Sequence, residues 1–362
     1  MKILFACGGT GGHIIPGLAL AEVFEKRIPG AQIVFVGTKR GLEQKIIGSS
    51  HWRLKMMHAV SFADKKGFGK ITALFGYVIS LFSAVGVLIK ERPDLVIGVG
   101  GYVAAPILMM ARFFRKTVVT LEPNAFPGMA NRFLGVFVDL VVVAFPGMEK
   151  FFPSKKIRLL GIPVRQSLYV VGAQKNADER IVVLVMGGSQ GARAINETIF
   201  QMLPLLTTFK EKLHFIHQVG AKADLKFSEE QYRALGFSAE VYPFIENMGA
   251  IYNRTSFVIA RAGAITVAEL MALKKPSLLI PFPFAAHNHQ EANARALEAT
   301  GGAQVVLEKE LTKEKLFEVI KRWIEHPNIL KQMTVGLEKL GNNNASEDIV
   351  NECLKRMHLK HV

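Results

Sequence analysis

The sequence predicts an α/β protein built from two doubly wound parallel sheets. In two places, about half a chain apart, an apolar strand-like run ends in a glycine-rich turn that opens a helix. The first run is Lys2–Cys7 followed by Gly8–His13, and the second is Ile181–Met186 followed by Gly187–Arg193. Further runs rich in Val, Ile and Leu alternate with helical patterns, which is typical of parallel sheets. A chain of 362 residues also exceeds what one hydrophobic core usually organises, so two domains are expected.

The first domain is expected to cover residues 1–161. Its predicted strands are 2–7, 32–36, 94–98, 117–121, 140–143 and 157–159. A third glycine-rich turn, Gly98–Tyr102, follows the strand at 94–98. Gly161–Arg165 combines glycine and proline, which indicates a hinge between two cores.

The second domain is expected to cover residues 162–339, where the alternation of strands and helices begins again. Its predicted strands are 181–186, 213–218, 239–242, 256–260, 277–280 and 304–306. The polar stretch Gly341–Asn344 precedes a final helix predicted at 346–357. We expect this C-terminal segment, at about 340–362, to pack back on the first domain.

The formal net charge of +15 is concentrated in the first half of the chain. Residues 1–161 carry 21 Lys and Arg against 9 Asp and Glu, whereas residues 162–362 carry 24 against 21. A basic domain beside a nearly neutral one indicates a polyanionic surface that only the first domain meets. Because the sequence shows no zinc-finger spacing, aromatic RNP-type strand or Arg-rich helix, we expect an anionic membrane leaflet rather than nucleic acid.

The cysteines and the first residues predict the compartment. Cys7 and Cys353 are the two cysteines, too few for a disulfide framework and suited to a reducing environment. The opening MKILFACGGTGGH is too short and too rich in glycine for a signal peptide. We therefore expect a cytoplasmic location.

Residues 71–89 form an uncharged segment bracketed by Lys70 and Lys90. Gly76 and Gly86 interrupt the segment, and a strand follows it at once, which argues against a transmembrane helix. Its apolar residues recur at helical spacing and define one face. Two interpretations remain: a buried crossover helix, or a helix whose outer face enters a membrane surface while its lysines pair with lipid phosphates.

The glycine-rich turns predict a ligand that carries phosphate. Exposed backbone N–H groups and the positive end of the helix dipole favour negative charge at such a turn. The dinucleotide fingerprint needs a glycine where Ile14 stands and an acidic residue after the next strand, which instead ends in Gly37–Arg40. No glycine loop carries the Gly-Lys-Ser/Thr of a Walker motif. The sequence therefore argues against both a dehydrogenase and a P-loop NTPase.

Several motifs occur in the order known from one bacterial family. They are GGTGGH from Gly8, GVGGY from Gly98, Leu121-Glu-Pro-Asn124, GIPVR from Gly161, GGSQGAR from Gly187, RAGAITVAE from Arg261 and HNHQEAN from His287. Together they resemble the MurG family of UDP-N-acetylglucosamine transferases, which make the lipid-linked precursor of peptidoglycan. The resemblance spans nearly the whole chain. It implies the GT-B architecture, in which two Rossmann-like domains flank a deep cleft.

The resemblance implies that the second domain binds UDP-GlcNAc. Glu269 would accept hydrogen bonds from the ribose hydroxyls, and the turn at residues 189–191 would hold the diphosphate. Arg165 resembles a phosphate-contacting arginine, although a surface arginine fits as well. Thr266 would touch the diphosphate or cap a helix. The donor residues implied are Arg165, Ser189, Gln190, Gly191, Ile245, Ala264, Thr266, Glu269, His289 and Gln290.

The first domain would then bind the acceptor and hold the catalytic base. His13 is suited to take a proton from the attacking sugar hydroxyl, or it holds an acceptor phosphate, and Glu122 is the rival base. This chain has Pro123 where the family usually has glutamine. The acceptor residues implied are Thr10, Gly11, Gly12, Gly101, Tyr102 and Asn124.

No cofactor is implied, because UDP-GlcNAc is a substrate. The sequence contains no Asp-x-Asp motif of the kind that binds a divalent ion in other transferases, and His287 and His289 lack a spaced third ligand, so we expect no protein-bound metal. The implied activity is inverting transfer of GlcNAc to undecaprenyl-diphosphate-MurNAc-pentapeptide (lipid I), which gives lipid II. The alternatives are a diacylglycerol glycosyltransferase, a UDP-GlcNAc epimerase, or a membrane-associated binding protein without turnover.

Overall fold

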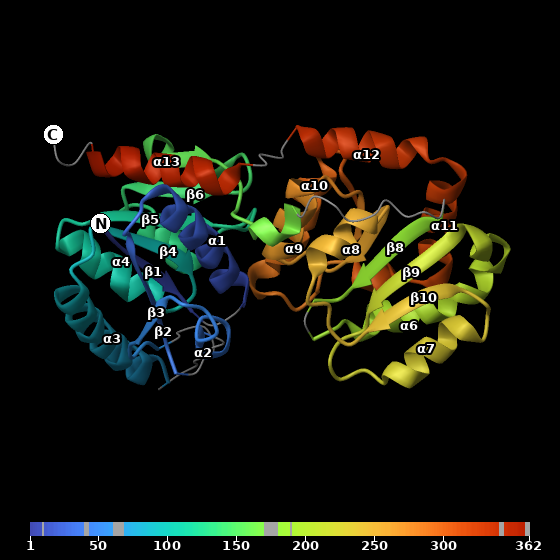
Figure 1. Ribbon diagram of the computed structural model, residues 1–362, viewed down its shortest axis with the longest axis horizontal. Coiled ribbons are helices and arrows are strands. Elements are labelled where there is room, and N and C mark those ends of the chain that lie inside the picture. Colours follow the sequence, from blue (N-terminus) through green and yellow to red (C-terminus); the bar gives the residue numbers. More distant parts are fainter. Residues whose placement is uncertain are drawn as a thin grey trace. The chain divides into compact units, whose positions relative to one another are not determined.

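The computed structural model divides the chain into two compact units (Figure 1). The first unit is Met1–Arg165 together with Asn344–Val362, and the second is Gln166–Asn343. Residues 162–165, which the sequence assigned to the second domain, thus belong to the first unit. The residues described are 1–8, 11–39, 43–60, 69–169, 180–188, 190–339 and 344–358.

The first unit contains a seven-stranded parallel sheet in the order β3-β2-β1-β4-β5-β6-β7. Its strands are β1 (Lys2–Cys7), β2 (Gln32–Gly37), β3 (Arg53–Met56), β4 (Leu95–Gly100), β5 (Thr117–Glu122), β6 (Leu140–Val143) and β7 (Ile157–Leu159). The sequence predicted all of these except β3. That edge strand reads RLKM, with no β-branched or aromatic residue to mark it.

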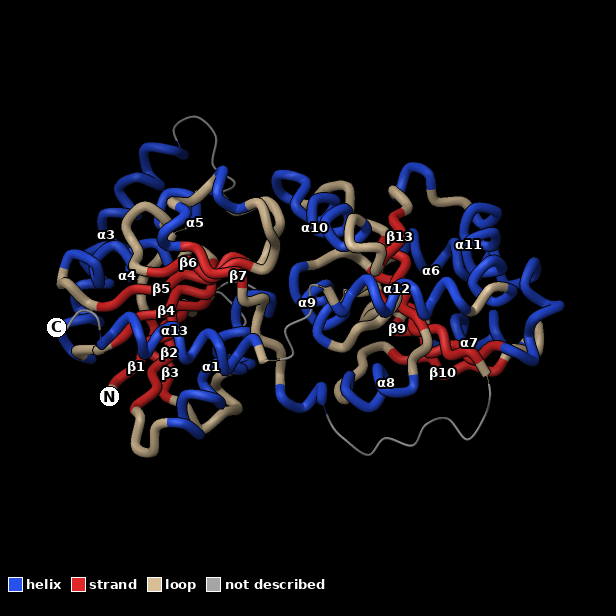
Figure 2. The backbone as a smooth tube through the Cα atoms, turned by 90° about the horizontal axis from the view of Figure 1, so that it is seen from above, coloured by secondary structure: helices blue, strands red, loops and turns tan. Residues whose placement is uncertain are grey.

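Helices cover both faces of this sheet. They are α1 (Gly11–Arg27), α2 (Glu43–Ile46), α3 (Gly69–Glu91), α4 (Ala104–Phe113), α5 (Met129–Leu134) and α13 (Ala345–His358). Alternate residues of β1 face opposite sides: Ile3, Phe5 and Cys7 join the core under α1 and α13, whereas Leu4 and Ala6 join the core under α3, α4 and α5. Figure 2 shows α3, α4 and α5 on one side of the sheet and α1 on the other.

The second unit contains a six-stranded parallel sheet in the order β10-β9-β8-β11-β12-β13. Its strands are β8 (Ile181–Met186), β9 (Leu213–Gln218), β10 (Ser238–Tyr242), β11 (Phe257–Ala260), β12 (Ser277–Leu279) and β13 (Ala303–Val305), all of which the sequence predicted. Its helices are α6 (Arg193–Met202), α7 (Leu225–Arg233), α8 (Met248–Arg254), α9 (Ala264–Ala272), α10 (His289–Glu298), α11 (Lys313–Glu325) and α12 (Asn328–Glu338). Both sheets therefore confirm the predicted doubly wound α/β fold.

The last helix completes the first unit. Ile349, Val350 and Cys353 of α13 are buried in the core under α1. Two ion pairs flank this contact, Arg27 to Glu347 at 3.2 Å and Arg158 to Glu352 at 3.4 Å. Such partly exposed pairs add little stability, so the apolar contact holds the helix in place.

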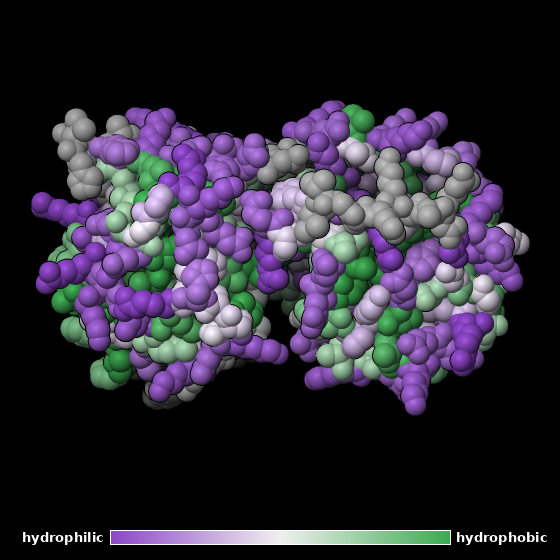
Figure 3. All heavy atoms as spheres, viewed as in Figure 1, coloured by the Kyte–Doolittle hydropathy of each residue, from purple (hydrophilic) through white to green (hydrophobic). Residues whose placement is uncertain are grey.

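Helix α3 connects β3 to β4, but its most apolar face does not point into the core. Phe75 and Phe82 are 71% and 73% exposed, while Ser80, Ala84 and Leu88 form the buried face. Apolar atoms reach the surface of the first unit at the lower left of Figure 3, where Figure 1 places α3. Helix α3 is therefore a crossover helix that buries one face and exposes an apolar one, and the entry of that outer face into a membrane surface stays a prediction. Within the described residues, no helix combines the length and apolar character that crossing a membrane requires.

Each sheet has one point where the strand order reverses. In the first unit this point lies between β1 and β4, and in the second between β8 and β11. Ligands of doubly wound sheets bind outside the carboxyl ends of the strands at such a point. The turns that follow these four strands are therefore the places to look for a site.

Candidate functional site

In the first unit, the turns after β1 and β4 pack against each other at the reversal point. The His13 ring lies against Gly100, where an added Cβ would be 2.5 Å from His13 Cδ2. At Gly101 an added Cβ would be 2.2 Å from the Gly8 carbonyl oxygen. Both glycines have positive φ values, 118° and 80°. Any side chain at either position would therefore separate the two turns.

The position of His13 defines its tautomer. Its Nδ1 lies 3.2 Å from the Gly8 carbonyl oxygen, which can only accept a hydrogen bond. Nδ1 therefore carries the proton, and Nε2 is the basic nitrogen of the neutral ring. Gly11 and Gly12 open α1 just before His13. Thr10 lies outside the described residues.

Glu122, the rival base, ends β5 and is 1% exposed. Its Oε1 accepts from the backbone N and Nδ2 of Asn124 at 3.0 and 3.1 Å. Its Oε2 accepts from Gly128 N at 3.1 Å and Asn131 Nδ2 at 3.0 Å. Burial raises the pKa of this carboxyl, and these hydrogen bonds act in the opposite direction. The arrangement suits an anchor for the segment 123–128 better than a base that must reach substrate.

Two other predicted acceptor residues are fixed by polar contacts. Asn124 is held by the Glu122 carboxylate through its side chain and its backbone. The Tyr102 hydroxyl lies 2.8 Å from Thr38 Oγ1, which joins the turn after β4 to the end of β2. Both residues therefore lie beyond the carboxyl ends of the strands, on the same edge as His13.

In the second unit, the turn after β8 is closely packed. Gly191 has φ of 75°, and an added Cβ there would be 2.1 Å from the Val219 carbonyl oxygen. Gln218 Nε2, at the end of β9, donates to the Gly188 carbonyl at 2.9 Å and stabilises the turn. Gln190 is exposed just before α6 begins. The turn therefore leads into α6, whose positive end favours negative charge. Ser189 lies outside the described residues.

A buried polar network supports this turn, and the sequence analysis did not find it. Asn196 Nδ2 donates to the Val219 carbonyl at 2.9 Å, and its Oδ1 lies 3.1 Å from His217 Nε2. His217 Nδ1 lies 2.9 Å from the Tyr232 hydroxyl. Burial lowers the pKa of His217 to about 3, so the ring is neutral. Its residues come from α6, β9 and α7, which no local sequence pattern connects.

Glu269, the predicted ribose ligand, is half-buried on α9 and receives a hydrogen bond from Tyr252. The Tyr252 hydroxyl donates to Glu269 Oε2 at 3.0 Å. Ala264 is the first residue of α9, and Gly263 occupies the N-cap position. Thr266 lies inside the helix, so the alternative that it caps α9 is wrong.

The ends of β11 and β12 are joined by residues of two predicted motifs. Arg261 donates to the Ile280 and Pro281 carbonyls, both at 3.2 Å, and pairs with Glu308. Asn293 Nδ2 donates to the Ala262 carbonyl at 3.2 Å. These bonds stabilise the carboxyl ends of β11 and β12, which precede α9 and α10 in the chain.

The predicted sugar-binding residues lie at the start of α10. Gln290 Oε1 accepts from Phe282 N at 3.0 Å, which leaves the Gln290 NH₂ group to donate. His289 Nδ1 lies 2.6 Å from the Ala286 carbonyl oxygen, so its Nε2 is the accepting nitrogen of the neutral ring. The two side chains thus offer a donor and an acceptor.

Two further predicted donor residues are Ile245 and Arg165. Ile245 is buried and follows β10 by a short loop. Arg165 is the exposed last residue of the first segment of unit one. The pKa of Glu22 on α1 is raised above its ordinary value, chiefly by burial, and the positive charge of Arg165 partly opposes this. Arg165 therefore lies near α1.

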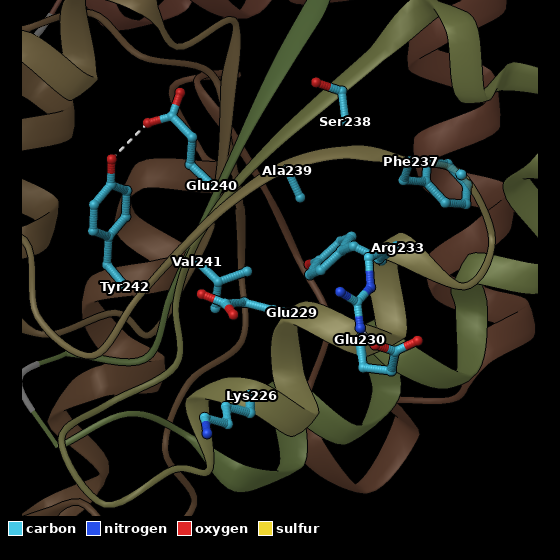
Figure 4. A pocket seen from close by; sticks show the side chains of 12 residues that line it. Lys226, Glu229, Glu230, Arg233, Phe237, Ser238, Ala239, Glu240, Val241 and Tyr242 are labelled. Carbon is cyan, nitrogen blue, oxygen red and sulfur yellow. Dashed lines mark hydrogen bonds and ion pairs between the residues drawn. The ribbon is translucent and has the colours of Figure 1, made fainter.

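A groove of about 990 Å³ lies elsewhere, between α7 and the edge strand β10 (Figure 4). Tyr242 donates to Glu240 Oε2 at 2.7 Å within it. Partial burial acts to raise the pKa of Glu240, but hydrogen bonds from Tyr242, Arg254 and His214 hold it below its ordinary value. The residues that line this groove include none of the predicted site residues. Among the described residues, no group of three or more His, Cys, Asp or Glu side chains is placed to hold a metal ion.

Two domain families match the two halves of the chain. Residues 3–143 match the glycosyltransferase family 28 N-terminal domain, and residues 182–352 match the glycosyltransferase family 28 C-terminal domain. Two such domains in this order, each with a doubly wound sheet, define a glycosyltransferase of family 28.

Full-length relatives narrow this class. The UDP-N-acetylglucosamine–N-acetylmuramyl-(pentapeptide) pyrophosphoryl-undecaprenol N-acetylglucosamine transferase of Myxococcus xanthus is 40% identical, over 99% of this chain and 93% of its own length. The enzyme of the same name from Syntrophus aciditrophicus is 39% identical, over 99% of each chain. The crystal structure of Acinetobacter baumannii MurG superposes with a TM-score of 0.80 and 28% identity, over 98% of this chain and 99% of that one. The chain therefore belongs to the MurG family of N-acetylglucosamine transferases, as its motifs indicated.

Proposed function

We propose that this protein transfers N-acetylglucosamine from UDP-GlcNAc to the lipid-linked acceptor undecaprenyl-diphosphate-MurNAc-pentapeptide, a step of peptidoglycan synthesis. The full-length similarity to the Myxococcus xanthus transferase carries this proposal. The reaction is one direct displacement. An acceptor hydroxyl loses its proton and attacks the anomeric carbon, UDP leaves, and the configuration at that carbon inverts.

The second unit binds the donor in this proposal. The turn at Gln190 and Gly191, at the positive end of α6, holds the diphosphate as charge grows on it. The Gly191 N–H donates to the Gly188 carbonyl at 2.9 Å and so fixes the shape of this turn. Glu269 accepts from the ribose hydroxyls, and His289 and Gln290 contact the sugar. The remaining donor contacts are assigned to Arg165, Ser189, Ile245, Ala264 and Thr266.

The first unit supplies the base and the acceptor site. His13 removes the proton, because its neutral ring presents Nε2 as the basic nitrogen at the reversal point of the sheet. Glu122 anchors the segment that carries Asn124, which orients the acceptor. Thr10, Gly11, Gly12, Gly101 and Tyr102 complete the acceptor site.

The leaving diphosphate is stabilised by the protein without a metal in this proposal. The sequence contains no Asp-x-Asp motif, and the turn before α6 presents backbone N–H groups at a helix start. We expect turnover to persist in excess chelator. Complete loss of turnover, restored only by a divalent ion, would contradict this assignment.

We assign the membrane contact to the α3–α5 apolar surface, defined by exposed apolar residues of three neighbouring helices and the loop after them. Its members are Phe75, Val78, Ile79, Phe82, Phe113, Met129, Phe133, Val136 and Phe137. Arg112 and Arg132 lie on the same helices, within the more basic part of the chain. Aromatic side chains that enter the lipid interface together with cations that attract anionic headgroups give peripheral binding. The protein would thus act at the cytoplasmic face of the inner membrane.

Vesicle binding tests this surface. Phe82→Glu places a charge on a 73% exposed position of α3, and Phe227→Glu does the same at a 56% exposed position of the second unit. We expect Phe82→Glu to reduce co-sedimentation with phosphatidylglycerol vesicles at least about fivefold, and Phe227→Glu to leave it unchanged. Equal binding by the two variants would reject this surface.

One assay separates the proposed activity from its alternatives. Protein and UDP-GlcNAc are mixed with lipid-linked MurNAc-pentapeptide, with diacylglycerol, or with no acceptor, and UDP release is measured. Release only with the MurNAc lipid supports the proposal. Release with diacylglycerol supports a glycolipid synthase, acceptor-independent conversion of the sugar supports an epimerase, and binding without turnover supports a non-catalytic protein.

A further inference from the structure

Tyr252 is a core residue of the second unit whose hydroxyl contacts the carboxylate of a predicted ligand-binding residue. Its side chain is 0% exposed, and its hydroxyl donates to Glu269 Oε2 at 3.0 Å. The same hydroxyl lies 3.7 Å from Met186 Sδ, at the end of β8. It therefore lies between the carboxylate on α9 and the strand that leads into the glycine-rich turn.

The helix that carries Tyr252 is held tightly in place. Asn247 caps α8 by accepting from Ala250 N at 3.2 Å. Gly249 packs so closely on the segment 166–169 that an added Cβ would be 2.3 Å from the Ser167 carbonyl oxygen. Because α8 packs closely on this segment and the ring is fully enclosed, the position of the hydroxyl is well defined.

A fixed donor matters for the chemistry of Glu269. A carboxylate that binds a ribose diol must present its oxygens in one orientation, yet a half-buried glutamate has rotatable bonds of its own. Burial, and then the neighbouring Glu269, raise the pKa of Tyr252 well above its ordinary value, so the phenol stays protonated and keeps donating. A charge-assisted hydrogen bond of this kind orients the carboxylate before the ligand arrives.

We propose that Tyr252 is the positioning residue for the donor ribose: through its hydrogen bond to Oε2 it holds Glu269 in the orientation that accepts the ribose hydroxyls. The nucleotide site then distinguishes UDP from its 2′-deoxy analogue through Tyr252 and Glu269 together. This inference rests on the proposed function, because it takes Glu269 as the ribose ligand.

Calorimetric titration of UDP and of 2′-deoxy-UDP tests the inference. The variants are Tyr252→Phe, Glu269→Ala and their combination, with Tyr232→Phe as the matched control. Tyr232 is equally buried in the same unit, but its hydroxyl contacts His217 instead of a carboxylate. Because that contact supports the turn after β8 and not Glu269, any effect of Tyr232→Phe should be the same for both nucleotides. The KM and kcat for UDP-GlcNAc are measured in parallel.

We expect Tyr252→Phe to weaken UDP binding about tenfold and 2′-deoxy-UDP binding less than about twofold. Tyr252→Phe should raise the KM for UDP-GlcNAc while kcat changes little, and it should cause no further loss of UDP affinity when Glu269 is already alanine. Tyr232→Phe, in contrast, should keep the preference for UDP over 2′-deoxy-UDP. The inference is overturned if Tyr252→Phe keeps the full preference, or if it weakens both nucleotides equally. If the wild type does not bind UDP, or Glu269→Ala binds it normally, the assignment of Glu269 fails first and the inference fails with it.

Discussion

Replacing Glu122 by glutamine distinguishes an anchor from a base. The Glu122 carboxylate accepts four hydrogen bonds, two on each oxygen, from donors that belong to its own loop and to α5. Glutamine has nearly the same shape, but one of its two ends is an NH₂ group. Whichever end this is, two donors lose their acceptor and face another donor.

The cost follows from the number of donors left unpaired. A fully buried donor without a partner costs about 1–3 kcal/mol, so two would cost roughly 2–6 kcal/mol. The donors from Asn124 are only partly buried and Gly128 is exposed, which lowers the cost. Burial already disfavours the charged form of Glu122 and raises its pKa, and glutamine removes that charge. We therefore expect a loss in the lower half of this range, confined to the first unit.

Hydrogen–deuterium exchange and kinetics together provide the assay. In Glu122→Gln, amides of β5 and α5 should exchange faster, and turnover should fall with a pH profile unchanged in shape. His13→Gln should leave exchange in these elements unchanged and lower turnover by about 10²–10⁴-fold. The reasoning is refuted if Glu122→Gln is as stable as the wild type but loses turnover to the extent that His13→Gln does.

Two further predictions concern the turns. Gly101→Ala should destabilise the first unit and lower turnover, because the φ of Gly101 is 80° and the new Cβ would be 2.2 Å from the Gly8 carbonyl oxygen. Gly128→Ala is the control: Gly128 has a φ of −62° and no atom lies within 4 Å of the new Cβ, so thermal unfolding should show no loss of stability. His217 has a pKa lowered from 6.5 to about 3 in the folded protein, so the unfolded chain binds more protons between these values and stability is lost as the pH falls. Between pH 7 and pH 5, protonation of His217 in the unfolded chain should lower the free energy of unfolding by about 2 kcal/mol. Urea unfolding of the second unit, followed by Trp323 fluorescence, should show this pH dependence in the wild type and not in His217→Gln. An equal pH dependence of the unfolding free energy in both proteins would reject the prediction.

The strands were predictable because most of them are buried on both faces. A parallel strand between two helical layers reads as a continuous apolar run, as Ile181–Met186 does, and needs no long-range information to be recognised. The edge strand β3 escaped prediction because only one neighbouring strand and a half-buried surface define it. Its residues carry no pattern of their own.

The sequence predicted the glycines of the site, but not the side chains that hold the binding groups in position. Gly101 and Gly191 have φ values of 80° and 75°, a backbone conformation that is set within the turn and favours glycine, so a local motif reveals them. The bond from Tyr252 to Glu269 and the network around His217 join elements that only packing brings together. Motifs therefore revealed where a ligand would bind, but not which side chains hold the binding groups in position.

By itself, the sequence determined the two doubly wound sheets, the turns that open α1 and α6, and the membership of the chain in its family, since each depends on the order and spacing of residues along the chain. Tertiary structure alone decided that the apolar face of α3 points outward. It also decided that the Glu122 carboxylate accepts its hydrogen bonds from its own loop and from α5. Both outcomes depend on which neighbours occupy the space around a side chain. The chain records hydrophobicity and charge residue by residue, whereas exposure and hydrogen-bond partners are fixed only when distant segments pack.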